Sequence, residues 1–140
     1  MSGLQQMVKQ FLYYPEPLPL DLPPPQWAGG AEEVWIKTGD GVMIHGLWWP
    51  HPAGEPVILF LHGNAQEVYS WSLVHQELAP LNYRLLLIDY RGYGKSQGEP
   101  TEAGLYLDGQ AALKWLQDQG VSAREIVVFG KSLGGGVACE

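Results

Sequence analysis

The stretch Ile126-Val127-Val128-Phe129-Gly130-Lys131-Ser132-Leu133-Gly134 decides the fold. Its first four residues form a continuous apolar run, which is typical of a strand buried on both faces of a parallel sheet. Its last five match the G-x-S-x-G pattern of a nucleophile elbow, in which the serine occupies a sharp turn between a strand and a helix. Gly130 and Gly134 let the strand and the helix approach without a Cβ clash, and the N-terminus of the following helix helps to stabilise an oxyanion. We therefore predict that Ser132 is a nucleophile.

Two earlier apolar runs, Val57–Leu61 and residues 85–88 of the strand Arg84–Ile88, predict further strands of the same kind. Apolar residues at helical spacing fill both intervals between the strands: Trp71, Val74, Leu78 and Leu81 in the first, and Leu105, Ala112 and Leu116 in the second. Thr101 is the expected N-cap of the second helix and Gly120 its stop. The order strand–helix–strand–helix–strand predicts a doubly wound parallel sheet.

A hairpin is predicted ahead of these elements. Residues 34–37 and 42–49 are rich in β-forming residues and are separated by a turn that contains Asp40-Gly41. The hairpin makes its two strands antiparallel, so the fold class is α/β with a mixed, mostly parallel sheet. Residues 15–25 hold six of the eleven prolines and predict an extended arm. We expect an N-terminal segment with this arm over residues 1–32 and the sheet-containing part over residues 33–140.

A second motif supports the elbow. The apolar strand Val57–Leu61 ends in His62-Gly63-Asn64. An oxyanion hole in this architecture needs one backbone N–H from the residue after the nucleophile and one from the loop after an earlier strand. We predict that Leu133 and Asn64 donate these two hydrogen bonds.

A third motif, Asp89-Tyr90-Arg91-Gly92-Tyr93-Gly94-Lys95-Ser96, follows the strand Arg84–Ile88. With these three motifs the chain resembles the N-terminal half of an α/β-hydrolase-fold serine hydrolase, in the branch that holds lipid hydrolases, depalmitoylating thioesterases and serine-aminopeptidase-like members. The resemblance implies hydrolysis of esters, thioesters or peptides. It also implies structural roles for Asp89 and Arg91, which brace loops, and for His62, which fixes the oxyanion loop.

The partners of an activated serine are missing from the chain. A serine nucleophile needs a histidine base and a carboxylate that orients it, and in the elbow fold both follow the serine. Only eight residues follow Ser132, and none is a histidine. We expect His45, His51 and His75 to be surface or packing residues. The triad Asp and His are therefore expected beyond residue 140, in a segment that completes a sheet truncated here after the elbow. On its own, this chain should be nearly inactive, with an exposed apolar edge at residues 126–129.

Composition excludes several classes of function. The chain has 140 residues, a net charge of −7 and no cluster of Lys or Arg, which excludes nucleic acid as a partner. One cysteine permits no disulfide framework. We expect no metal and no cofactor, because no metal-ligand spacing occurs and the two Gly-Lys-Ser triplets lack the first glycine of a P-loop. The expected partner is a small ester or acyl substrate.

No run of 18 apolar residues occurs, and residues 1–14 lack the apolar core of a signal peptide. We expect a cytoplasmic protein, with contact between residues 1–14 and a membrane surface as a weaker alternative. Two other functions stay open. The chain is either a non-catalytic binding protein that covers its open edge with a partner, or one half of a split hydrolase that a second chain completes.

Overall fold

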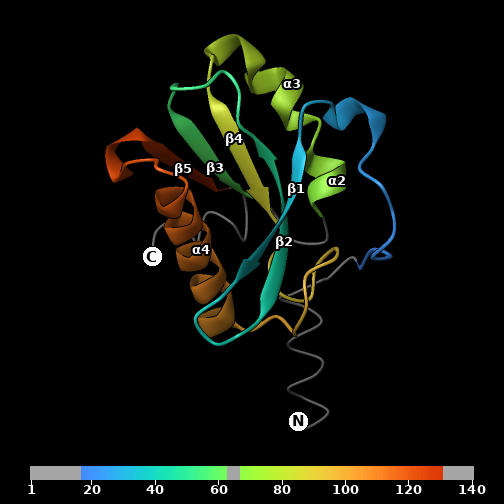
Figure 1. Cartoon of the computed structure of the whole chain (residues 1–140). Coiled ribbons are helices and arrows are strands. Elements are labelled where there is room, and N and C mark those ends of the chain that lie inside the picture. Colours follow the sequence, from blue (N-terminus) through green and yellow to red (C-terminus); the bar gives the residue numbers. More distant parts are fainter. Residues whose placement is uncertain (1–16, 63–66, 131–140) are drawn as a thin grey trace, which may run out of the picture.

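A five-stranded mixed sheet forms the centre of the molecule (Figure 1). The structure is a computed structural model that describes residues 17–62 and 67–130. The strands are β1 (Glu32–Lys37), β2 (Met43–Trp49), β3 (Val57–Leu61), β4 (Arg84–Ile88) and β5 (Ile126–Gly130), in the order β1-β2-β4-β3-β5. β1 and β2 form the predicted antiparallel hairpin, and β2 pairs antiparallel with β4. β3 lies between β4 and β5 and is parallel to both, which confirms the predicted fold class.

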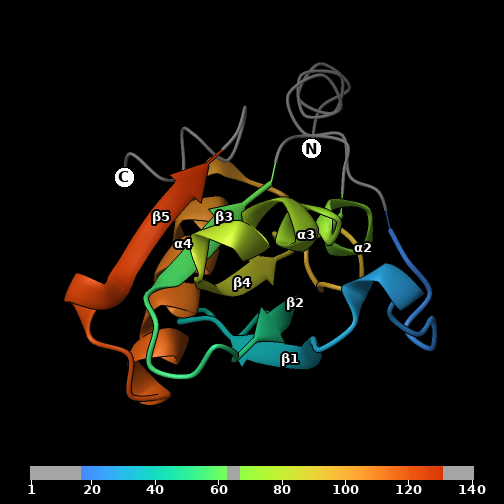
Figure 2. The ribbon, with the colours of Figure 1, turned by 90° about the horizontal axis from the view of Figure 1, so that it is seen from above.

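Helices cover both faces of the sheet (Figures 1 and 2). They are α2 (Val68–Trp71), α3 (Val74–Leu78) and α4 (Glu102–Asp118), with the short 3₁₀ turns η1 (Gln26–Ala28), η2 (Ala79–Leu81) and η3 (Ala123–Glu125). Buried residues form two clusters, because alternate side chains of a strand point to opposite faces. Leu59 and Leu86 pack with α4 in one cluster, whereas Phe60 and Leu87 pack with α2 in the other.

The helix α4 begins and ends where its sequence signals predict. Thr101 is the N-cap, and its side chain accepts a hydrogen bond from the backbone N–H of Gly104. Leu105 and Leu116 are fully buried against the sheet. Gly120, just past the end, has φ of +89°, a conformation that favours glycine.

The first helical interval differs from the prediction. We predicted one helix from Trp71 to Leu81, but α2, α3 and η2 form separate short turns there. The hydroxyl of the buried Ser72 donates to the carbonyl of Tyr69, 2.6 Å away, and so competes with the helical pattern at the end of α2. Pro80 has no N–H to continue α3.

β5 lies at the edge of the sheet (Figure 1). Within the described residues it pairs only with β3, along one side. Val127, Val128 and Phe129 are exposed, the last of them to 52%. This matches the expected apolar edge at residues 126–129. Elsewhere in the described part of the chain, no helix is both long enough and apolar enough to cross a membrane.

Candidate active site

Two neighbouring strands lead into the predicted motifs. β3 and β5 are parallel, and Leu61 lies directly opposite Gly130 in their register. In the sequence His62 follows the first of these residues and Lys131-Ser132 follow the second, so the strands that precede the two motifs end side by side. The predicted residues Gly63, Asn64, Ser132, Leu133 and Gly134 lie outside the described residues.

Asp89 holds the two ends of the segment after β3. It follows β4 and is completely buried. Its Oδ1 atom accepts hydrogen bonds from His62 Nε2 at 2.8 Å and from the backbone N–H of Val68 at 2.9 Å. Burial raises the pKa of the Asp89 carboxyl, and the hydrogen bond from His62 opposes that rise. One carboxylate oxygen thus fixes the residues on both sides of positions 63–66.

The structure shows why the third motif has a glycine at position 94. A Cβ atom at this position would come within 1.9 Å of Asp89 Oδ2, and the φ angle is +53°. Only glycine fits such a close approach in the left-handed region. Gly94 is therefore required for close packing against Asp89.

Arg91 joins three parts of the molecule. Its Nε and Nη2 atoms donate to Asp108 Oδ1 on α4, at 3.0 and 2.9 Å, and its backbone N–H donates to Asp108 Oδ2 at 2.8 Å. Its Nη1 and Nη2 atoms also donate to Asp40 in the turn between β1 and β2. Burial raises the pKa of the Asp108 carboxyl, and the hydrogen bonds from Arg91 oppose that rise. Arg91 therefore contacts loops and α4 in the way a bracing residue would.

A polar cluster that sequence reasoning missed lies beside these supports. Glu33 Oε1 accepts from His45 Nε2 at 2.9 Å, from the Tyr69 hydroxyl at 2.8 Å and from Lys95 Nζ at 2.8 Å. The four residues are distant in the sequence, and no spacing pattern connects them. Lys95 was the one hint in the sequence, because it stands between glycines in a chain with only 16% charged residues, and a lysine there suggests a buried acidic partner.

The histidines outside the motifs have structural surroundings. His45 is fully buried in this cluster, and His75 stacks on Trp49 with ring centroids 4.6 Å apart. Burial lowers the pKa of both imidazoles, although in His45 the contact with Glu33 opposes this. His51 lies exposed in the turn before β3. These positions agree with the expectation of packing and surface roles.

The Glu33 cluster predicts a pH-dependent contribution to stability. Burial raises the pKa of the Glu33 carboxyl, but hydrogen bonds from Lys95, Tyr69 and His45 outweigh it and lower the pKa from 4.5 to about 2. A carboxylate with a depressed pKa stabilises the fold above its unfolded value and loses that contribution as the pH falls toward its folded value. Glu33→Gln should therefore reduce the free energy of unfolding by about 1 kcal/mol near neutral pH, after discounting for solvent screening.

Urea-induced unfolding measured from neutral pH down to pH 2 would check this prediction. The difference between the variant and the unaltered protein should shrink as the pH falls from 4.5 toward 2. Glu32→Gln is the matched control, because Glu32 is an exposed neighbour on β1 that takes no part in the cluster. A difference that stays constant over this range would contradict the assigned ionisation of Glu33.

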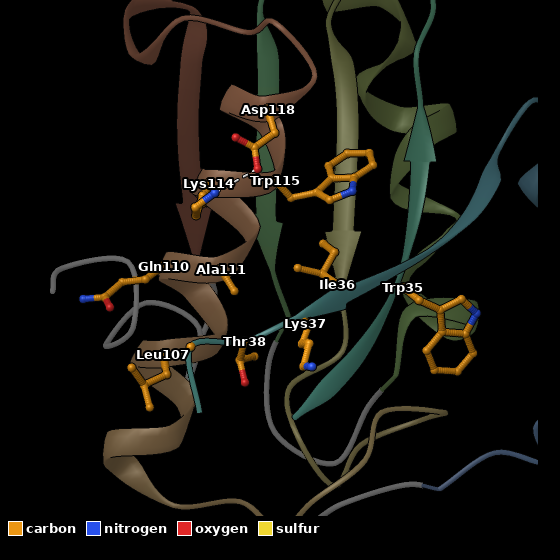
Figure 3. A pocket seen from close by; sticks show the side chains of 11 residues that line it. Trp35, Ile36, Lys37, Thr38, Leu107, Gln110, Ala111, Lys114, Trp115 and Asp118 are labelled. Carbon is orange, nitrogen blue, oxygen red and sulfur yellow. Dashed lines mark hydrogen bonds and ion pairs between the residues drawn. The ribbon is translucent and has the colours of Figure 1, made fainter. Parts of the chain in front are cut away.

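Two hollows are lined by residues outside the predicted motifs. A cleft of about 460 Å³ separates β1 from α4, and Figure 3 shows side chains of both elements along it, with Lys114 paired to Asp118. A second groove of about 590 Å³ is lined mainly by apolar residues of β3, β5 and the α2–η2 region. Neither is lined by His62, Asp89 or Gly130. Among residues 17–62 and 67–130, no group of three or more acidic, His or Cys side chains could hold a metal ion.

Comparison with known families decides the identity of the fold. The sequence profile of a family described as alpha/beta hydrolase fold matches residues 56–140. The chain belongs to this family. Membership in the alpha/beta hydrolase fold family confirms the resemblance carried by the three motifs.

Similar proteins support this placement. An uncharacterized protein of Mycobacterium tuberculosis is 35% identical over 93% of this chain, and Protein bem46 of Schizosaccharomyces pombe is 37% identical over 76% of it. The solved structure of the esterase Pf2001 from Pyrococcus furiosus is 28% identical, with a TM-score of 0.69 over 89% of this chain. The chain covers 47%, 38% and 48% of these three proteins, respectively, and so spans half of their length or less.

Proposed function

We propose that the chain is part of a serine hydrolase that cleaves carboxylic esters or thioesters. The Ser132 hydroxyl oxygen forms a bond to the acyl carbon, and the bond from that carbon to the alcohol or thiol breaks. A base takes the serine proton and passes it to the leaving group. Water then hydrolyses the acyl-enzyme and releases the acid. The N–H groups of Asn64 and Leu133 stabilise the tetrahedral oxyanion.

The observation that carries this proposal is the pairing of Leu61 with Gly130. An elbow and an oxyanion loop must meet within a few ångströms of the reacting carbonyl, and adjacent parallel strands direct both motifs to one edge of the sheet. The buried carboxylate of Asp89 supports the proposal further, because it restrains His62 and Val68 on either side of the predicted oxyanion donor. Preorganised donors are what this chemistry requires.

The base and its orienting carboxylate are proposed to come from a completing segment. His62 and His45 already contact Asp89 and Glu33, and both imidazoles are buried. Asp89 and Asp108 are held in structural contacts as well. None of these groups is therefore assigned to the triad. The Asp and His of the proposed mechanism would follow Ser132 in the chain order of the elbow fold.

Labelling with a fluorophosphonate tests this function. The protein expressed at the length its gene encodes should be labelled at Ser132, and Ser132→Ala should lower the labelling rate by about 10⁴-fold or more. Ser122→Ala is the matched control, because Ser122 lies at the start of η3 and is not part of the predicted site. The 140-residue chain alone should be labelled far more slowly. Labelling that persists in Ser132→Ala, or no labelling of the encoded protein, would refute the proposal.

The exposed edge of β5 favours one second candidate, a split hydrolase. A separate polypeptide would pair with β5 and supply the Asp and His. Labelling of the 140-residue chain that recovers only when a second chain from the same source is added would support this arrangement. If that second chain binds without restoring labelling, a non-catalytic binding role is supported instead.

A further inference from the structure

The proline-rich arm lies against two elements that border the candidate site. In the structure this arm extends over residues 17–31, which run past α2 (Figure 1). At one end, Pro17 forms a bridge with Gly94, and the N–H of Leu18 donates to the Gly94 carbonyl at 2.8 Å. At the other end, Ala28 is buried in the cluster on the α2 face of the sheet. The arm is therefore attached at both ends to the body of the molecule.

Between these attachments the arm holds Tyr69 at two points. The Tyr69 hydroxyl lies 2.9 Å from the backbone carbonyl of Leu22 and 2.8 Å from Glu33 Oε1, so its one hydrogen is shared between these two acceptors. The backbone carbonyl of Tyr69 accepts from Trp27 Nε1 at 3.3 Å. Tyr69 is the second residue of α2, a helix too short to be stable without outside contacts. The arm thus helps to fix the position of α2.

The same carbonyl of Leu22 also completes the surroundings of a buried ammonium. Lys95 Nζ donates to Leu22 O at 2.6 Å and to Glu33 Oε1 at 2.8 Å, and it lies 5.1 Å from the centre of the Tyr69 ring. The Lys95 side chain is only 2% exposed. A buried ammonium needs acceptors for its protons, so loss of the arm would leave it poorly compensated.

The two residues that the arm contacts, Tyr69 and Lys95, each adjoin a residue that contacts the Asp89 carboxylate. Val68 precedes Tyr69, and its N–H donates to Asp89 Oδ1. Gly94 precedes Lys95 and packs against the other oxygen of the same carboxylate. We propose that the arm is a positioning element for the site, acting through Tyr69 and Lys95 to hold α2 and Asp89 in place. This inference rests on the proposed function, since it is the Ser132 reaction that the arm would support.

Three variants of the protein at its encoded length test the proposal: Tyr69→Phe, Lys95→Met and a deletion of residues 1–24. Each should raise hydrogen–deuterium exchange of the backbone over residues 67–72 by about tenfold, because α2 loses contacts that protect it. Each should also lower kcat for a small nitrophenyl ester by about tenfold with KM unchanged, since misplacement of a distant support affects the reacting geometry. If the arm only stabilised the fold, kcat of the folded variants would not fall while KM stayed unchanged.

Tyr106→Phe is the matched control, because the Tyr106 hydroxyl bonds Glu102 on the exposed side of α4, and the variant should change neither measurement. Unchanged exchange over residues 67–72 in folded variants would overturn the role of the arm, whatever Ser132 does. Faster exchange with an unchanged kcat would overturn it as a positioning element. If the unaltered protein shows no Ser132-dependent turnover, the proposed function fails, and the positioning role fails with it, even where exchange has increased.

Discussion

Asp89→Ala is expected to reduce the free energy of unfolding by about 3–5 kcal/mol. The carboxylate is completely buried, and one of its oxygens accepts from both His62 Nε2 and the Val68 N–H. Alanine would leave both donors buried without an acceptor, each at a cost of about 1–3 kcal/mol, and would open a void beside Gly94. Urea-induced unfolding would measure the loss.

Two further variants define the origin of that loss. Asp89→Asn keeps an oxygen at the position that His62 and Val68 contact, so it should cost less than alanine, about 1–2 kcal/mol. Asp118→Ala removes an exposed carboxylate that pairs with Lys114 on α4, and it should change stability by less than about 0.5 kcal/mol. If Asp89→Ala cost no more than Asp118→Ala, the two anchoring hydrogen bonds would not contribute to the stability of the fold.

Local sequence signals were sufficient for the framework of the fold. The apolar runs of β3, β4 and β5 have the length and continuity of parallel strands buried on both faces, and the structure places them as neighbours. The cap and stop of α4 act within four residues of the backbone that they terminate, so Thr101 and Gly120 could be read directly. By contrast, a buried hydroxyl at Ser72 interrupts the α2–α3 region, and burial depends on the tertiary structure.

The supports of the candidate site were predictable only in part. Asp89 and Arg91 stand in a motif, so a bracing role could be expected, but their partners could not. Asp108 on α4 lies 17 residues from Arg91, and Asp40 lies 51 residues away. The cluster around Glu33 joins β1, β2, α2 and the loop after β4, and only the folded sheet brings these segments together. The nucleophile and its oxyanion donors remain predictions from the motifs.

Asp108→Ala should have an effect as large as Asp89→Ala, for a different reason. Asp108 is fully buried and accepts three hydrogen bonds from Arg91, two from the guanidinium and one from the backbone. Removing the carboxylate would leave Arg91 paired only with the partly exposed Asp40. Breaking a buried ion pair on one side costs about 3–5 kcal/mol, and here the guanidinium would lose its buried partner and keep only the partly exposed one. The same unfolding measurement applies.

A double-mutant cycle separates the contribution of the Arg91–Asp108 ion pair from the contribution of side-chain packing. Arg91→Met alone should destabilise the fold as Asp108→Ala does, since it leaves the Asp108 carboxylate buried without its partner. The third variant of the cycle is Asp108→Leu alone. Combining it with Arg91→Met replaces both charges by apolar groups and should recover part of the loss, with a coupling energy of about 2 kcal/mol or more. Arg91→Lys should not restore stability, because a lysine cannot reach Asp108 and Asp40 with a planar fork of donors. Additive losses in the cycle would mean that Arg91 stabilises the loop through packing of its side chain, and the ion pair would then not be the brace between α4 and the segment after β4.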